Sequence, residues 1–319
     1  MDIGQGISIG GGVTFQAEGG GGGGGTQRAI FGYGTTGSAT AITNLVSNTG
    51  VVGNDVTGVG TARSYLAAAG YGTDKAIFGY GLNPSSAVVS MTNKVSNTGV
   101  VATDTTGVGT ARYGLAAAGY GSDKAIFGYG DADPPRTAIT NKVSNTGVVA
   151  TDTTGVGTAR TSLAAAGYGT DKAIFGNGTT TGAAAGITAI TNLVSNTGVV
   201  GNDVTGVGTG RRQIAAAGYG TDKAIFGYGR SGGGLVSVTN LVSNTGVVAT
   251  DTTGVGTARS NLAAAGYGTD KAIFGYGLNN SGTNVSMTNL VSNTGVVATD
   301  TTGVGTARQA LAAAGYSTT

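Results

Sequence analysis

Cysteine, histidine and tryptophan are missing from this 319-residue chain, and only three prolines are present. Without cysteine the chain has no disulfides and no thiolate sites. Without histidine it has no imidazole base, no imidazole metal ligand and no Ser–His pair for nucleophilic catalysis. Glu18 is the only glutamate. These absences predict a protein that is not an enzyme and that carries no cofactor.

Charge and long apolar runs are also scarce. Charged residues make up 10% of the chain, with a net charge of +2, against roughly 25% charged in an ordinary soluble domain. Because the basic residues form no cluster, we expect no nucleic-acid partner. No run reaches the ~20 apolar residues of a membrane span. The first residues lack the basic and apolar regions of a signal peptide, so we expect folding in the cytoplasm.

Glycine is abundant, at 64 residues, but it follows a repeat. The repeated stretch runs through Gly-Thr-Ala-Arg, Leu-Ala-Ala-Ala-Gly-Tyr and Asp-Lys-Ala-Ile-Phe-Gly-Tyr-Gly, as at residues 109–130. A fixed period of this length is typical of a repeat architecture. The arginine of the repeat recurs every 48 to 51 residues, at Arg63, Arg112, Arg160, Arg211, Arg259 and Arg308.

The two ends of the repeat array are complementary fragments of one unit. The array begins at Arg28 with Arg-Ala-Ile-Phe and ends at residues 311–316 with Leu-Ala-Ala-Ala-Gly-Tyr. In a closed ring the last strand would lie beside the first and complete a sixth unit. The sequence therefore predicts an all-β fold: a six-bladed β-propeller of four-stranded antiparallel blades, closed by pairing of the N- and C-terminal strands. In one unit the strands are expected at residues 112–119, 124–129, 138–143 and 147–151.

Three regions follow from this pattern. Residues 28–319 form the propeller, and residues 18–27, which include seven consecutive glycines, form a flexible tether. Residues 1–17 are too few to bury a core and are expected to be a short β/coil arm that docks on another protein. The anchor residues of this arm are Ile3, Ile7, Ile9, Val13 and Phe15.

The order of these segments resembles kelch-type propeller repeats. It consists of a small-residue strand after an arginine, an apolar strand ending in Gly79-Tyr-Gly81, a variable loop, and a strand–turn–strand close around Asn97-Thr98. The resemblance covers residues 28–319. It departs from the family in the separated glycines and in the missing tryptophan, near whose place Val100 or Val101 stands. Kelch-type copper oxidases need histidine and a cysteine-modified tyrosine, which are absent, and regulator-of-chromosome-condensation repeats are the nearest alternative.

The first ten residues carry a second resemblance. Met-x-Ile-Gly-x-Gly-Ile-x-Ile-Gly is similar to the N-termini of some structural proteins of tailed phages. This resemblance implies a virion component that assembles in the cytoplasm and acts at the virion or extracellular surface. Residues 1–17 would then contact other virion or assembly proteins, and the chain would belong to a homo-oligomeric assembly.

Repeated charged residues have a structural and a functional interpretation. The Asp-Lys pairs, such as Asp123-Lys124, form either turn caps or a charged binding ring. The arginines either bridge neighbouring blades, through carbonyls or through acids such as Asp104, or line a pocket. Each copy of Asp-Thr-Thr-Gly supplies one carboxylate, too few for the usual Ca²⁺ site. We favour the structural interpretation for each and predict no metal.

The repeats differ from one another in two places, the pair after each arginine and the segment after each Phe-Gly-Tyr-Gly. In an antiparallel blade both places open onto one face of the ring. Loops on a rigid scaffold are where binding sites usually lie, although unconstrained loops also vary. The candidate ligand-binding residues are Tyr65, Tyr113, Arg212, Gln213, Asn261, Gln309, Asn83, Asp131, Asp133, Arg136, Arg230 and Asn279.

These observations predict a non-enzymatic virion structural or appendage protein, of fibre or decoration type. Its variable face would bind a glycan or receptor on a host surface. One alternative is a purely architectural decoration protein, and another is a glycan-cleaving propeller enzyme.

Overall fold

A computed structural model describes residues 26–318. The predicted docking arm with its anchor residues, and the glycine run of the tether, lie outside the described residues. The last two residues of the predicted tether, Thr26 and Gln27, belong to the first strand, β1 (Thr26–Gly32).

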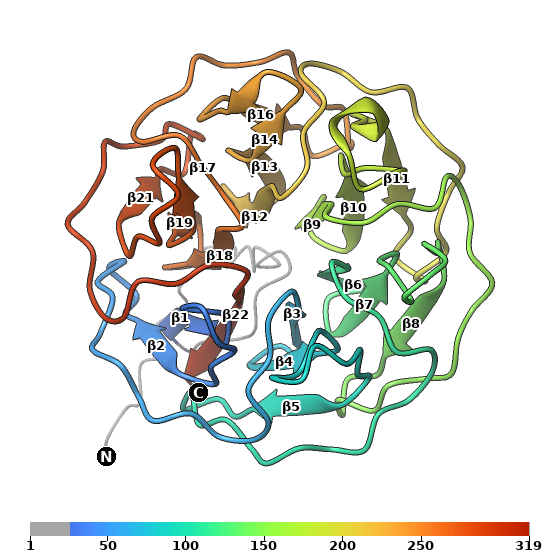
Figure 1. The fold of residues 1–319 in the computed structure, drawn as a ribbon, viewed down its shortest axis with the longest axis vertical. Coiled ribbons are helices and arrows are strands. Elements are labelled where there is room, and N and C mark those ends of the chain that lie inside the picture. Colours follow the sequence, from blue (N-terminus) through green and yellow to red (C-terminus); the bar gives the residue numbers. More distant parts are fainter. Residues whose placement is uncertain (1–25, 319) are drawn as a thin grey trace, which may run out of the picture.

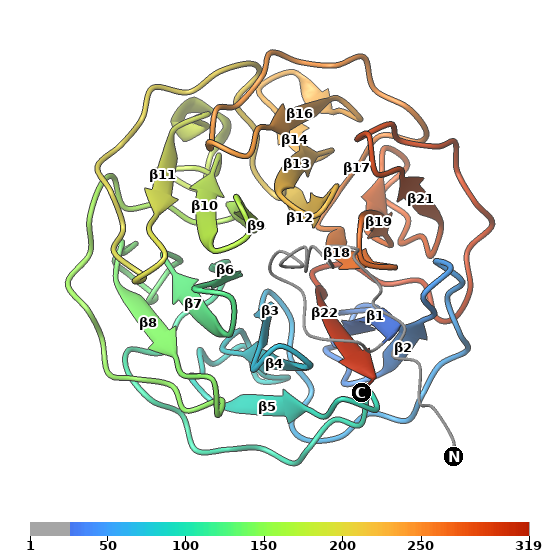
Figure 2. The same ribbon diagram turned by 180° about the vertical axis from the view of Figure 1, so that it is seen from behind.

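The described chain is all-β and contains six three-stranded antiparallel sheets. They surround a common centre, and one end strand of each sheet is innermost (Figure 1). The view from behind shows the same ring (Figure 2). From the innermost strand outward, sheet 1 is β22 (Ala312–Thr318), β1 and β2 (Thr43–Val46); sheet 2 is β3 (Ala67–Tyr71), β4 (Lys75–Gly79) and β5 (Thr92–Val95); sheet 3 is β6 (Ala116–Tyr120), β7 (Lys124–Gly128) and β8 (Thr140–Val143); sheet 4 is β9 (Ala164–Tyr168), β10 (Lys172–Gly176) and β11 (Thr191–Val194); sheet 5 is β12 (Ala215–Tyr219), β13 (Lys223–Gly227) and β16 (Thr239–Val242); sheet 6 is β18 (Ala263–Tyr267), β19 (Lys271–Gly275) and β21 (Thr288–Val291).

Smaller elements lie in the variable segments. Two short ladders pair β14 (Arg230–Ser231) with β15 (Gly234–Leu235), and β17 (Arg259–Ser260) with β20 (Leu278–Asn279). A single 3₁₀ turn, η1, spans Ala184–Gly186. Within residues 26–318 no helix has the length and apolar character needed to cross a membrane.

Small residues let the innermost strands approach one another around the centre. A Cβ on Gly119 of β6 would lie 3.4 Å from the carbonyl oxygen of Gly70 in β3. The middle strands are buried on both faces, and the Ala, Ile and Phe side chains of Lys-Ala-Ile-Phe-Gly are fully buried. Each phenylalanine packs on a glycine of the neighbouring sheet, as Phe175 does on Gly128. The cycle of these contacts returns from sheet 6 to sheet 1, where Phe31 packs on Gly275.

The expected pairing of the two chain ends is confirmed. Strand β1 pairs with β22 in an antiparallel register from Thr26↔Thr318 to Gly32↔Ala312. Sheet 1 is thus built from both ends of the described chain, as the complementary repeat fragments predicted.

The expectation of four strands per sheet is wrong, because each sheet has three. The predicted fourth strand, residues 147–151, is reduced to isolated bridges such as Val143↔Val149 and Thr140↔Thr153. It leaves the ladder because Asp152, between these bridges, accepts hydrogen bonds from Thr110 on the segment that enters the sheet. The innermost strand also begins later than predicted, at Ala116 instead of Arg112, because Gly114 adopts a left-handed conformation (φ 60°).

Candidate ligand-binding face

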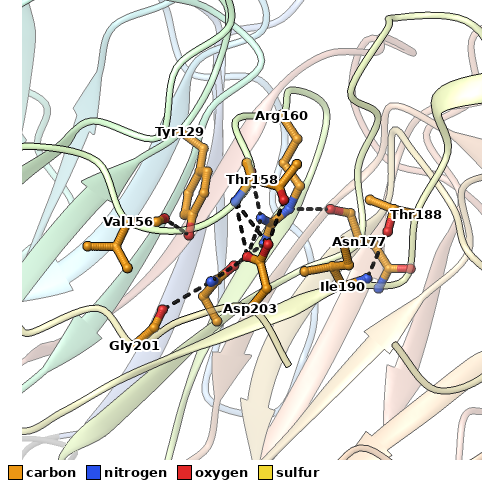
Figure 3. A network of polar contacts seen from close by, with 10 residues as sticks. Tyr129, Val156, Thr158, Arg160, Asn177, Thr188, Ile190, Gly201 and Asp203 are labelled. Carbon is orange, nitrogen blue, oxygen red and sulfur yellow. Dashed lines mark hydrogen bonds and ion pairs between the residues drawn. The ribbon is translucent and has the colours of Figure 1, made fainter. Parts of the chain in front are cut away.

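The repeated arginines hold the sheets together from inside and do not reach a binding surface. All six are fully buried. Arg160 donates from Nε to the Asn177 carbonyl (2.9 Å), from Nη1 to the Thr158 carbonyl (3.1 Å) and from Nη2 to Asn192 Oδ1 (2.7 Å). Its guanidinium lies 4.4 Å from the ring centroid of Tyr129 in the preceding sheet (Figure 3). Burial lowers the pKa of Arg160, and the neighbouring Tyr129 and Asp203 oppose that shift.

The repeated aspartates fasten the segment that enters each sheet. Asp203 accepts hydrogen bonds from the backbone N–H of Thr158 (3.1 Å), from its hydroxyl (2.5 Å) and from Asn192 Nδ2 (2.9 Å) (Figure 3). Burial alone would raise the pKa of Asp203, but these hydrogen bonds outweigh it and keep the pKa below the usual range. Two arginines also lie within ion-pair distance of such an acid, Arg160 at 4.0 Å from Asp203 and Arg259 at 3.5 Å from Asp300.

A closed cycle of six backbone hydrogen bonds surrounds the centre at the entrance of the innermost strands. Each bond joins the second residue after a repeated arginine to the equivalent residue of the next sheet, as Ser162 N–H donates to the Gly114 carbonyl (2.7 Å). All six residues have positive φ, from 53° to 60°, although only one is glycine. This backbone ring lies over leucine and isoleucine side chains and encloses a cavity of about 60 Å³. The six residues are Tyr65, Gly114, Ser162, Gln213, Asn261 and Ala310.

The two variable sets lie beside each other at this end of the ring. Antiparallel bridges join the residue after each arginine to the segment after each Phe-Gly-Tyr-Gly, for example Tyr113↔Asp131, Arg212↔Arg230 and Thr35↔Gln309. Figure 1 shows β14, which belongs to one such segment, beside sheet 5. We call this end of the ring the variable face. It contains the twelve candidate residues predicted from the sequence.

Several of these candidates form the loops themselves. Asn83 Oδ1 accepts from the N–H groups of Ser85 (3.0 Å) and Ala87 (2.9 Å), and Asn279 does the same for its own turn. Asn261 Nδ2 donates to Gln309 Oε1 (2.9 Å). The oxygen atoms of Asn83 and Asn279 are therefore occupied by turn structure.

Arg136 and Arg212, two of the charged candidates, contact the insertion at residues 179–186. Asp131 is 7% exposed, pairs with Arg136 (3.4 Å) and caps the N–H of Asp133 (3.1 Å). Arg136 Nη1 also donates to the Thr180 carbonyl (3.4 Å), and Arg212 Nη1 donates to the Gly182 carbonyl. Asp133 and Arg230 are exposed.

Tyr65 and Tyr113, on neighbouring sheets, form an edge-to-face pair with their ring centroids 6.3 Å apart. Both side chains are half-buried. Burial raises the pKa of Tyr65. Burial also raises the pKa of Tyr113, and the negative charges of Asp131 and Asp133 add to this shift. The pair is therefore a neutral aromatic surface with two hydroxyls at physiological pH.

At the opposite end of the ring, the residues change little from one sheet to the next. A cavity of about 230 Å³ opens there, lined by the inner-strand glycines and by five lysines. Each lysine bonds the aspartate before it, as Lys124 does at 2.6 Å from Asp123, and this bond holds the pKa of Asp123 below its ordinary value. The outer turns of this lysine face expose one valine per sheet by 61–66%: Val51, Val100, Val148, Val199, Val247 and Val296.

Within residues 26–318 no three histidine, cysteine, aspartate or glutamate side chains come together as a metal site would require. Apart from the exposed Asp133, the described aspartates instead bond threonine, asparagine, lysine or arginine. A scan against protein-family models finds no match, and a search of curated proteins finds no significant similarity. The site must therefore be interpreted from its own geometry.

Two features of the site had been missed from the sequence. The buried asparagine that bonds five of the six arginines lies in the repeated Thr-Asn pair of the outer strand, such as Asn192, and its recurrence with the arginine was the available signal. The backbone ring had no signal, because five of its six positions are occupied by residues that do not indicate positive φ as glycine would.

Proposed function

We propose that the six sheets form a six-bladed, kelch-like β-propeller whose variable face binds a glycan or receptor on a host surface. In this proposal the chain is a non-enzymatic virion structural or appendage protein of fibre or decoration type. The observation that carries it is the concentration of sequence differences at one end of an otherwise uniform ring. Tyr65, Tyr113 and Gln213 supply aromatic and amide groups there, and such groups suit the rings and hydroxyls of a glycan.

The positions of the chain ends support this orientation. Thr26 and Thr318 are paired, and Gln27 and Ser317 line the cavity of the lysine face. Attachment through residues 1–17, the arm that would contact other virion proteins, therefore starts from the face opposite the variable loops. A particle anchored in this way would present the variable face outward.

The binding proposal is tested by substituting three variable-face side chains together, Tyr65→Asn, Tyr113→Ser and Gln213→Asn. Asparagine tolerates the left-handed conformation at positions 65 and 213. The control triple variant changes Val51, Val100 and Val148 of the lysine face to threonine. We expect adsorption to host cells, measured by flow cytometry of labelled protein, to fall for the first variant and persist for the control. If circular dichroism shows that both triple variants are folded and they adsorb equally, the proposal is refuted.

A second candidate function is purely architectural, and the exposed valines favour it. Six equivalent valines at 61–66% exposure give the lysine face a repeated apolar surface suited to packing on a particle. Here the valine variant, and not the variable-face variant, would lose incorporation into particles. Deleting residues 1–25, which leaves β1 intact, separately tests the docking arm by particle co-sedimentation.

A further inference from the structure

The variable face differs most from sheet to sheet in its charges. In five of the six sheets, the bridge between the two variable sets joins residues that are not both cationic, such as Ser64↔Leu82 and Thr161↔Thr179. In sheet 5 it joins Arg212 to Arg230. Their backbones exchange both hydrogen bonds, with N···O distances of 3.0 and 2.8 Å.

Directly opposite residues of an antiparallel pair project to the same side of the ladder, so these two arginines start as neighbours. Like charges in this arrangement disfavour folding. Within residues 26–318 neither arginine has a carboxylate within ion-pair distance. The nearby acid Asp131 is already paired with Arg136.

Arg212 is positioned by the fold, whereas Arg230 is free to meet a ligand. The Arg212 side chain is half-buried and donates from Nη1 to the Gly182 carbonyl, while its buried Nε–H has no partner in the described chain. Arg230 is exposed, and its side chain makes no hydrogen bond within the described chain. The two hydrogen bonds of the bridge hold both backbones in place. Gln213, the residue after Arg212, belongs to the backbone ring and carries a side-chain amide.

We infer that Arg212 and Arg230 bind the anionic group of an acidic glycan. The pair supplies two cations that no described carboxylate neutralises, and the side-chain amide of the next residue, Gln213, can hydrogen-bond sugar hydroxyls. Guanidinium groups bind both carboxylates and phosphates through paired N–H donors. The inference rests on the proposed binding function of the variable face and narrows its ligand class.

The experiment measures binding of the full chain to hexagalacturonate and to the same oligosaccharide with its carboxyl groups reduced. Two double variants each remove two positive charges: Arg212→Gln with Arg230→Gln, and the control Lys94→Gln with Lys142→Gln. The control lysines lie on outer strands and bond the carbonyls of Thr146 and Thr197 (3.1 Å each). Arg230→Gln alone is the cleaner variant, because it breaks no bond within the described chain.

We expect the unaltered chain to bind the acidic form at least tenfold more tightly than the reduced form. The arginine variants should lose on the order of tenfold in affinity, since hydrogen bonds to charged groups are being removed, and the lysine control should not. Arg230→Gln should also keep or raise the unfolding temperature, because it relieves a like-charge contact. A purely structural arginine would lower it. Glucuronate and inorganic phosphate, added as competitors, decide whether the anion is a carboxylate or a phosphate.

Equal affinity for the acidic and reduced oligosaccharides, or unchanged affinity in Arg230→Gln, would overturn the inference. This failure is distinct from failure of the proposed function. If the tyrosine and glutamine substitutions abolish host-cell adsorption while Arg230→Gln does not alter it, the variable face binds a ligand, but that ligand is not recognised by its charge.

Discussion

Exchanging one buried residue between two equivalent sheets should change stability in opposite directions. Five sheets carry a fully buried tyrosine after Phe-Gly, and sheet 4 carries Asn177 instead. Tyr129 packs edge-to-face on Phe175 (5.1 Å, 60°), lies 4.4 Å beneath Arg160, and donates from its hydroxyl to the Val156 carbonyl (3.0 Å). Arg211, above Asn177, has no ring beneath it, and burial lowers its pKa to about 10.

The magnitude follows from these contacts. The ring pair contributes about 1 kcal/mol, the buried cation–π contact about 2 kcal/mol and the hydroxyl bond about 1 kcal/mol. Asparagine recovers about 1 kcal/mol because it adopts the left-handed conformation more easily than tyrosine. We therefore expect Tyr129→Asn to lower the free energy of unfolding by about 3 kcal/mol. Asn177→Tyr should raise it by about 1–2 kcal/mol, since it also gives up the bond from Arg211 N–H (3.2 Å).

Urea unfolding followed by circular dichroism measures both changes as shifts of the midpoint. Tyr129→Phe is the matched control, because it removes only the hydroxyl and should cost about 1 kcal/mol. A lower midpoint for Asn177→Tyr would show that the site beneath Arg211 cannot seat a ring, and the reasoning would be refuted.

Two further predictions concern buried tyrosines and the contacts between sheets. Burial raises the pKa of Tyr80, Tyr129 and Tyr228 to about 12, from 10.0. These tyrosines therefore ionise at lower pH in the unfolded chain than in the folded one. The stability that depends on their neutral form should be complete below pH 10 and should be lost as the pH rises towards 12. Unfolding followed by circular dichroism, alongside absorbance at 295 nm, should show the last tyrosines ionising together with unfolding, and ionisation of all thirteen tyrosines in a chain that is still folded would contradict this. Gly128→Ala would place a Cβ 2.7 Å from Phe175 Cζ and should cost about 1–3 kcal/mol in urea unfolding. Gly232→Ala meets nothing within 4 Å and should stay within about 0.5 kcal/mol of the unaltered chain; equal midpoints for the two variants would exclude crowding between sheets.

Much of the fold could be predicted from the sequence, because it depends on repeated short-range patterns. The hairpin from Ala-Ala-Ala-Gly-Tyr to Lys-Ala-Ile-Phe-Gly and the pairing of β1 with β22 follow from strand patterns and from the split repeat. The lost fourth strand did not follow, because Asp152 competes for it through a hydrogen bond to Thr110, 42 residues away in sequence. Such side-chain contacts leave no periodic trace.

The candidate site was predictable in position but not in the role of each residue. Sequence differences between the repeats identified which residues would share a face of the ring. It could not separate Asn83, whose oxygen caps its own turn, from Arg230, whose side chain makes no bond within the described chain. That difference depends on turn geometry, which single residues do not specify.

The pairing of β1 with β22 also bears on how the ring can be rebuilt. The Thr–Asp bond that enters each sheet recurs in sheet 1 between Thr306 and Asp55 (3.0 and 2.5 Å), so this junction is made like the others. Because β1 and β22 are paired, the chain could be joined across Thr26 and Thr318 and opened elsewhere in the ring. A circular permutant opened at the exposed turn around Val148 should keep the same contacts while moving both termini to the rim. New partners could then be attached at the outer edge of the lysine face without covering the variable face.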